Sequence, residues 1–237
     1  MKMFDRKIYF DRVRPMFGGA LMQRQVDGQE AILTRWETDP PSDDLRHLAN
    51  PLAQAKWETS SEMWPIEEYE KGAGHSYGEP DPETGHAYYG RGLVQLTHRD
   101  NYDRATSELE LEGEDDLVWH PDRALDPIIA AEVMFIGMLE GWFRTGNDGK
   151  PETLHKYFND ERDDPYGARE IVNGDKTKVP TWSGGVSIGN LIAADHATFL
   201  EALLQASLIE PEAPEDEVTV TITIDAPSNV VVNIVRL

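Results

Sequence analysis

The stretch from residue 52 to residue 102 decides the fold and reads LAQAKWETSSEMWPIEEYEKGAGHSYGEPDPETGHAYYGRGLVQLTHRDNY. Its apolar spacing predicts a helix that ends in a carboxylate at Glu58. Glycines and prolines then break the helical period, which indicates turns that join short extended pieces. A Gly-Arg-Gly turn at residues 90–92 leads into a second helix. The order of parts is therefore helix, extended excursion and helix.

The excursion is rich in acidic and aromatic side chains. From Glu58 to Arg91 eight residues are acidic and two are basic. The aromatic residues around them are Trp57, Trp64, Tyr69, Tyr77, Tyr88 and Tyr89. Carboxylates can transfer protons, and flat aromatic rings can pack against sugar rings. The stretch by itself therefore indicates a cleft for the hydrolysis of glycosidic bonds, which uses a pair of carboxylates.

The length and composition place the chain in the globular class. With 237 residues, of which 39% are hydrophobic, it can form one domain with a sizeable core and a small appendage. No apolar run approaches the roughly 18 residues of a membrane helix, so no membrane partner is expected. Residues 1–15 are too charged for the apolar core of a secretory signal, which predicts synthesis in the cytoplasm.

Composition also argues against several kinds of site. The chain has no cysteine, which excludes disulfides, thiolate-bound metals and a cysteine nucleophile. The histidines of the stretch, His75, His86 and His98, lack the spacing of metal ligands, and neither a metal nor another cofactor is expected. The net charge of −22 disfavours nucleic acid as a partner, because phosphate contacts require Lys and Arg.

Residues 1–208 predict a mainly helical domain. The helix that starts at Asp126-Pro127 has the clearest beginning and is apolar nearly all round, so we expect it to be central and buried. The other predicted helices cover residues 1–17, 25–37, 97–109 with Thr97 as N-cap, 154–158, 165–174 closed by Gly174, and 190–208.

The helix that carries Glu58 leaves two alternatives. It begins near Asp43 or Asp44 and contains Pro51, at a cost of about 3 kcal/mol, or it begins anew with Asn50 as N-cap and Pro51 as its first residue. In both cases Glu58 lies near the C-terminal end. The helix dipole disfavours a negative charge there, which helps to keep the carboxyl protonated.

The composition changes after residue 208. Residues 209–217 form an acidic, proline-bearing linker, and residues 218–237 contain two runs of strand composition joined by turn residues. An isolated hairpin is marginal in water. We therefore expect this C-terminal β-hairpin to pack on the main domain or to pair with another copy, which makes a homo-oligomer one of the expected states.

Four blocks of the chain resemble glycoside hydrolase family 19, in its phage and bacterial branch of chitinase-like endolysins. They are WETSSEMWPIEEYE, YGEPDPETGHAYYGRGLVQLTHRDNY, ALDPIIAAEVMFIGM and AREIVNG. YYGRGLVQLT is the most specific piece, and the similarity runs through most of the first 205 residues. The resemblance implies a lysozyme-like, mainly α (α+β) fold with a small β element beside the active-site cleft. The hairpin lies outside it.

The resemblance assigns the two catalytic carboxylates. The family's acid is a Glu that ends a helix in a His-Glu-Thr motif, which places it at Glu58, with Trp57 in the position of the histidine. A tryptophan beside the carboxyl would raise its pKa by desolvation. The Pro-Ile-x-Glu-Tyr match places the second carboxylate at Glu68, and Glu67 and Glu70 remain alternatives because this spacing varies among relatives.

The resemblance also assigns substrate-binding residues. Polar groups after the Gly-Arg-Gly turn correspond to Gln95, Thr97 and Asn101, and a late Asn of the family corresponds to Asn173. Consecutive tyrosines at 88 and 89 face opposite sides if the backbone is extended, and Tyr89 is assigned to the cleft. Arg91 between glycines is expected to be a buried partner of a carboxylate.

The implied mechanism inverts the configuration of the sugar. Glu58 protonates the leaving oxygen and Glu68 activates a water, with the carboxyls roughly 6.5–9.5 Å apart. The expected substrate is peptidoglycan, cut at β-1,4 bonds by an endolysin that reaches the cell wall after release. Two alternatives stay open: a chitinase acting on β-1,4-linked N-acetylglucosamine, and a catalytically inactive wall-binding or virion structural protein.

Overall fold

The computed structural model describes residues 3–207, so the predicted linker at 209–217 and hairpin at 218–237 lie outside the described residues. The described part is mainly helical with one small antiparallel sheet. Its elements are α1 (Arg6–Val13), α2 (Gln23–Thr38), α3 (Arg46–Glu58), β1 (Ile66–Glu67), β2 (Arg91–Gly92), α4 (Arg99–Glu108), α5 (Pro127–Glu140), α6 (Leu154–Tyr157) and α7 (Ile188–Ser207). Short 3₁₀ helices include η1 (Arg14–Phe17), η4 (Pro121–Leu125) and η5 (Gly167–Ile171).

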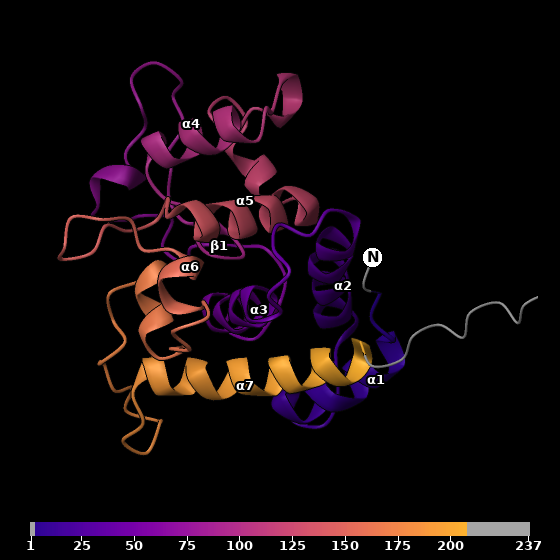
Figure 1. The fold of residues 1–237 in the computed structure, drawn as a ribbon. Coiled ribbons are helices and arrows are strands. Elements are labelled where there is room, and N and C mark those ends of the chain that lie inside the picture. Colours follow the sequence, from indigo (N-terminus) through magenta and orange to yellow (C-terminus); the bar gives the residue numbers. More distant parts are fainter. Residues whose placement is uncertain (1–2, 208–237) are drawn as a thin grey trace, which may run out of the picture.

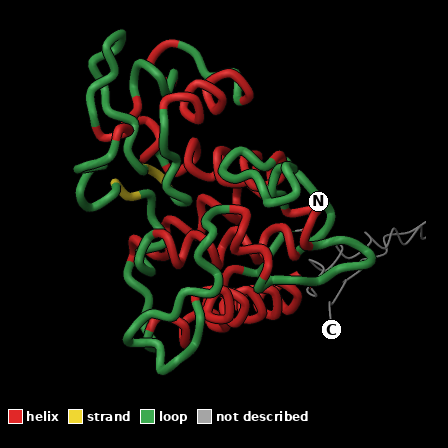
Figure 2. Tube along the Cα trace, turned by 90° about the vertical axis from the view of Figure 1, so that its left-hand side faces the viewer, coloured by secondary structure: helices red, strands yellow, loops and turns green. Residues whose placement is uncertain are grey.

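Helix α7 forms the base of the molecule, and α3 and α1 pack against it (Figure 1). On the other side of α3, α2 packs against α5, and α4 lies beyond α5. The two short strands, yellow in Figure 2, lie between the helices below and the loops above. No helix in residues 3–207 combines the length and hydropathy needed to cross a membrane.

Helix α5 is the central helix that its sequence predicts. Asp126 caps it by accepting from the backbone N–H of Ile128 and Ile129, and Pro127 is its first residue. Its apolar residues serve two clusters. Ala131 and Met134 belong to the larger cluster with α1, α2, α3 and α7, whereas Ile129 and Val133 belong to a smaller cluster with α4 and η4. A helix that packs on two sides must be apolar nearly all round.

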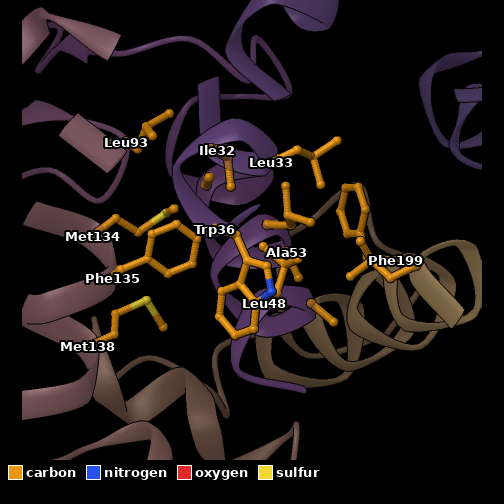
Figure 3. Packing of buried hydrophobic residues seen from close by; sticks show 14 of the residues in the cluster. Ile32, Leu33, Trp36, Leu48, Ala53, Leu93, Met134, Phe135, Met138 and Phe199 are labelled. Atoms are coloured by element: carbon orange, nitrogen blue, oxygen red, sulfur yellow. The ribbon is translucent and has the colours of Figure 1, made fainter. Parts of the chain in front are cut away.

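The larger cluster shows how the helices are held together. Trp36 of α2 packs against Phe135 of α5, with ring centroids 5.6 Å apart (Figure 3). On the other side, Leu48 and Ala53 of α3 approach Phe199 of α7 (Figure 3). All of these side chains are fully or almost fully buried. Helix α3 therefore lies inside the core, which fixes the position of the carboxylate at its end.

Helix α3 is continuous and contains Pro51, so the alternative with Asn50 as an N-cap is wrong. Proline removes one backbone hydrogen bond to the carbonyl four residues earlier, here that of His47. Every residue from His47 to Ala55 is buried, and this packing outweighs the local preference of proline. Burial of the segment therefore explains why the helix continues through Pro51.

Two predicted helix ends are also wrong. Helix α4 begins at Arg99, with His98, at φ 73°, in the N-cap position and no side-chain cap, so Thr97 lies outside it. The Thr97 hydroxyl donates to the carbonyl of Gln95 at 2.7 Å. Within the 165–174 segment the structure has the 3₁₀ helix η5, which ends at Ile171 with Val172 as C-cap, so Gly174 does not close it. The first predicted helix is divided into α1 and η1 next to Pro15.

Candidate active site

Glu58 is the last residue of α3, as predicted. Thr59 ends the helix by donating its hydroxyl to the carbonyl of Ala55 at 2.7 Å and accepting from the N–H of Met63 at 2.9 Å. Ser60, Ser61 and Met63 then have positive φ values of 50°, 69° and 54°. Such values cost free energy in residues other than glycine and often accompany functional sites. The turn holds the carboxyl of Glu58 at the end of a rigid helix.

The charged partner of Glu58 is Arg169 of η5. Its Nη1 lies 2.5 Å from Oε1 of Glu58 and donates at 2.9 Å to Oε1 of Gln54. Its Nε donates at 2.7 Å to Oδ1 of Asp175. The Arg169 side chain is 1% exposed and that of Glu58 is 14% exposed. We call Gln54, Glu58, Arg169 and Asp175 the Glu58 cluster.

Two opposed effects act on the proton of Glu58. Burial raises its pKa because the charged form loses hydration, and Arg169 lowers it by charge attraction and by its hydrogen bond. Burial is the larger effect, so the pKa of Glu58 is raised above its ordinary value. A carboxyl of this kind keeps its proton to a higher pH, as a general acid requires.

Trp57, the residue before Glu58, packs its ring against that of Trp182.

Glu68 follows β1 directly and is tied to the start of β2. Its N–H donates to the carbonyl of Gly90 at 2.7 Å, and its Oε2 accepts from the N–H of Gly90 at 3.1 Å. The hydroxyl of Tyr77 lies 3.3 Å from Oε1. We call Glu68, Tyr77 and Gly90 the Glu68 cluster. Its carboxylate is half-buried and held by groups that carry no charge.

Glu67 has different partners from Glu68. Register places it opposite Arg91, and successive strand residues face opposite sides of a sheet. Its Oε1 accepts from the hydroxyl of Tyr89 at 2.6 Å, and its Oε2 lies 3.0 Å from Nζ of Lys71. These two bonds lower the pKa of Glu67, and the bond from Tyr89 has the larger influence. Glu70, the third candidate, is exposed.

Gln95, Thr97 and Asn101 form a chain of hydrogen bonds at the entry to α4. Nε2 of Gln95 donates to the carbonyl of Ile66 at 3.2 Å, which ties this chain to β1. Nδ2 of Asn101 donates to the carbonyl of Thr97 at 2.8 Å, which leaves its amide oxygen for another partner. A Cβ at Gly90 would lie 2.8 Å from Oε1 of Gln95, so a larger residue there would displace the Gln95 amide. These residues therefore lie against the Glu68 cluster.

Both tyrosines before the Gly-Arg-Gly turn are buried, Tyr88 at 3% and Tyr89 at 8% exposure. The guanidinium of Arg91 lies 3.7 Å from the ring centroid of Tyr89. Arg91 is itself buried and pairs with Asp122 at 3.0 Å, so its expected structural role is confirmed. Tyr89 holds Glu67, and its contact with a substrate stays a prediction.

Asn173 is exposed and lies next to the Glu58 cluster, because its N–H donates to the carbonyl of Arg169 at 3.0 Å. The structure thus gathers the predicted residues in two groups, Glu58 with Asn173 and Glu68 with Gln95, Thr97 and Asn101. Sequence reasoning missed Arg169, Gln54 and Asp175. Gln54 precedes Glu58 by one helical turn and shares its face, which was an available signal.

Comparisons with known proteins find solved structures with a similar fold. No protein-family model and no curated protein matches the sequence. The structure is similar to chitinase C from Streptomyces griseus HUT6037, with 19% identity, a TM-score of 0.53, and coverage of 86% of this chain and 78% of that chain. A bacterial family 19 chitinase has 18% identity, a TM-score of 0.52, and coverage of 84% of this chain and 94% of that chain.

A variant of chitinase C in which a glutamate is replaced by glutamine is also similar, with 19% identity, a TM-score of 0.50 and the same two coverages as the first structure, 86% and 78%. At these identities the likeness concerns the fold. The helical architecture with one small sheet confirms the predicted fold class. The protein therefore has the lysozyme-like fold of the family 19 chitinases.

Proposed function

We propose that the protein is a glycoside hydrolase that cleaves β-1,4 bonds with inversion, with Glu58 as the acid and Glu68 as the base. The observation that carries the proposal is the carboxyl at the end of α3. It is almost buried, its pKa is raised, and a fully buried arginine orients it. The similarity of the fold to that of chitinases supports the same activity.

The first half of the reaction uses the Glu58 cluster. Arg169 contacts Oε1 of Glu58, which leaves Oε2 to carry the proton toward the glycosidic oxygen. As the bond between C1 and that oxygen breaks, the proton moves to the leaving sugar. Glu58 becomes a carboxylate, and the guanidinium that lies 2.5 Å away stabilises its new charge.

The second half uses the Glu68 cluster. A water attacks C1 from the face opposite to the leaving group and gives a proton to Glu68, so that the configuration at C1 is inverted. The amide oxygen of Asn101 and the hydroxyl oxygen of Thr97 are suited to orient this water or a substrate hydroxyl. Glu68 is preferred to Glu67, because Tyr89 and Lys71 occupy both carboxylate oxygens of Glu67 and lower its pKa.

For the substrate we propose peptidoglycan, cut by an endolysin, with chitin as the second candidate. Both polymers contain β-1,4-linked N-acetylglucosamine, so the same acid and base serve either one. The names of the similar structures favour chitin. The resemblance of the sequence blocks to phage and bacterial endolysins favours peptidoglycan and action on the cell wall after release.

The test compares the wild type with Glu58→Gln on purified peptidoglycan, followed by turbidity, and on chitin oligosaccharides in parallel. Glutamine keeps the contact with Arg169 and removes the proton donor. We expect turbidity to fall with the wild type and to stay constant with the variant. Glu161→Gln, at an exposed position that belongs to neither cluster, is the matched control and should act as the wild type does.

Each possible result decides between the hypotheses. Activity on only one polymer identifies the substrate. Equal clearing by the wild type and Glu58→Gln would remove Glu58 from the mechanism. A wild type that binds glycans but cleaves neither polymer would favour the inactive wall-binding or virion protein.

A further inference from the structure

A pair of tryptophans, the exposed Trp182 and the half-buried Trp57, takes no part in the proposed chemistry. Trp182 has 70% of its surface exposed, more than any other tryptophan in residues 3–207. Its ring centroid lies 6.1 Å from that of Trp57, and the two planes are tilted by 31°. Exposed indole surface gains free energy when it is covered. Exposed apolar surface of this kind often marks a binding site.

The two rings line a groove of about 720 Å³ between the end of α3 and the first half of α7. Its apolar walls include Pro180, Ile188 and Leu191. Its polar lining consists of Lys56, Ser60, Ser61, Lys178 and Asp195. A groove that combines flat apolar walls with a few polar groups is typical of sites for small organic ligands.

The loop that carries Trp182 is closed at its base although its side chain is exposed. The N–H of Ile188 donates to the carbonyl of Lys178 at 2.9 Å, and the hydroxyl of Ser183 donates to the carbonyl of Pro180 at 2.9 Å. The first bond fixes the base of the loop against the start of α7, and the second tightens the turn next to Trp182. The backbone that carries the indole is therefore ordered before any ligand binds, which lowers the entropic cost of binding.

Both walls of the groove are connected to the Glu58 cluster. Trp57 precedes Glu58, and Ser60 and Ser61 follow it by two and three residues. The opposite wall includes Lys178, three residues after Asp175, which Arg169 binds together with Glu58. The groove is thus joined through the chain to the carboxyl that we propose as the acid.

We propose that Trp57 and Trp182 form a saccharide subsite that binds a pyranose ring of the glycan outside the bond that is cut. The inference rests on the proposed function and adds a further binding site for the same substrate. The flat C–H face of a pyranose packs on the indole of Trp182, while its hydroxyls bond to Ser60, Ser61 and Lys178. The apolar face and polar edge of a sugar match the walls and the polar lining of the groove.

The experiment measures binding by calorimetry in the Glu58→Gln protein, which does not consume its ligand. N-acetylglucosamine oligomers of increasing length are titrated into this protein and into the same protein carrying Trp182→Ala. We expect the longer oligomers to bind about fivefold to tenfold more weakly to the Trp182→Ala protein. The shortest oligomer, which does not reach the groove, should bind equally to both. Trp182→Phe keeps an aromatic ring and should restore most of the affinity.

Trp119→Ala is the matched control, because Trp119 is also exposed, at 48%, and lies outside this groove. It should leave every affinity unchanged. Equal binding by the parent and Trp182→Ala at all lengths would overturn the subsite, as would a loss of equal size at all lengths or with Trp119→Ala. A wild type that cleaves no glycan, combined with Trp182-dependent binding of long oligomers, would overturn the proposed hydrolysis and keep the subsite.

Discussion

The two carboxylates proposed for catalysis lie in contrasting surroundings. Glu58 ends a core helix, and its partner is a buried arginine. Glu68 follows a two-residue strand and is held by a backbone N–H and a tyrosine hydroxyl. An acid needs burial to keep its proton, whereas a base that activates water needs contact with water. The difference in surroundings matches the opposite tasks that we propose for the two carboxyl groups.

Replacement of the base should have the largest effect. Glu68→Gln should lower kcat by about 100-fold or more, because the water loses its proton acceptor. Glu67→Gln is the comparison variant and should stay within about fivefold of the wild type. Steady-state kinetics on soluble oligosaccharides measure both. The reverse order of effects would make Glu67 the base and leave Glu68 as a structural link to Gly90.

Removal of the buried arginine should be the next largest effect, here on stability. Arg169→Met leaves the buried carboxylates of the Glu58 cluster without their cation, and we expect the free energy of unfolding to fall by about 3–5 kcal/mol. Urea denaturation measures the change. Arg99→Met removes ion pairs with Asp81 and Glu83 at the surface and should change stability little. Equal effects of the two variants would contradict the contrast between the two regions.

Acid should weaken the core that supports Glu58. His196 of α7 stacks on Phe158 with ring centroids 5.1 Å apart, and burial lowers its pKa to about 4 from 6.5. The unfolded chain then binds more protons than the folded chain between these two values, so stability falls as pH falls from 6.5 to 4. The expected loss is about 3 kcal/mol. The charged groups that also influence the pKa of His196 are Asp163, Arg46 and Asp44.

Urea denaturation at several pH values measures this effect. His196→Phe should remove this part of the pH dependence, because phenylalanine has the same aromatic surface and no proton to bind. An unchanged slope of stability against pH in the variant would show that other groups cause the acid sensitivity. The lowered pKa of His47, which burial also causes, acts in the same direction and remains in the variant.

The smallest expected effect is a change in the pKa of Glu67. The hydroxyl of Tyr89 and the amine of Lys71 both lower the pKa of Glu67, and the tyrosine has the larger influence. Tyr89→Phe should therefore raise the pKa of Glu67 more than Lys71→Ala does. Titration of the carboxyl carbon by NMR measures both shifts. A larger shift in Lys71→Ala would mean that charge, and not the hydrogen bond, controls Glu67.

Local signals in the sequence predicted most of the helical elements. The Asp126-Pro127 start of α5 and the carboxylate at the end of α3 were correct because capping and apolar period act over a few residues. The helix boundary at Pro51 failed, since burial on all sides of α3 outweighs the preference of one proline. Thr97 failed as a cap because His98, at positive φ, takes the N-cap position and the helix begins only at Arg99.

The sequence by itself determined that Glu58 ends a helix, that carboxylates and aromatic rings crowd the next segment, and that the part of the chain described by the structure, residues 3–207, is mainly helical. Only the tertiary structure decided that Arg169, 111 residues away from Glu58, is its partner. It also decided that Trp57 packs beside Trp182 and that both rings line one groove. The physical reason is that periodicity and capping depend on neighbours in the chain, whereas the pKa of a buried carboxyl depends on groups that only folding brings near.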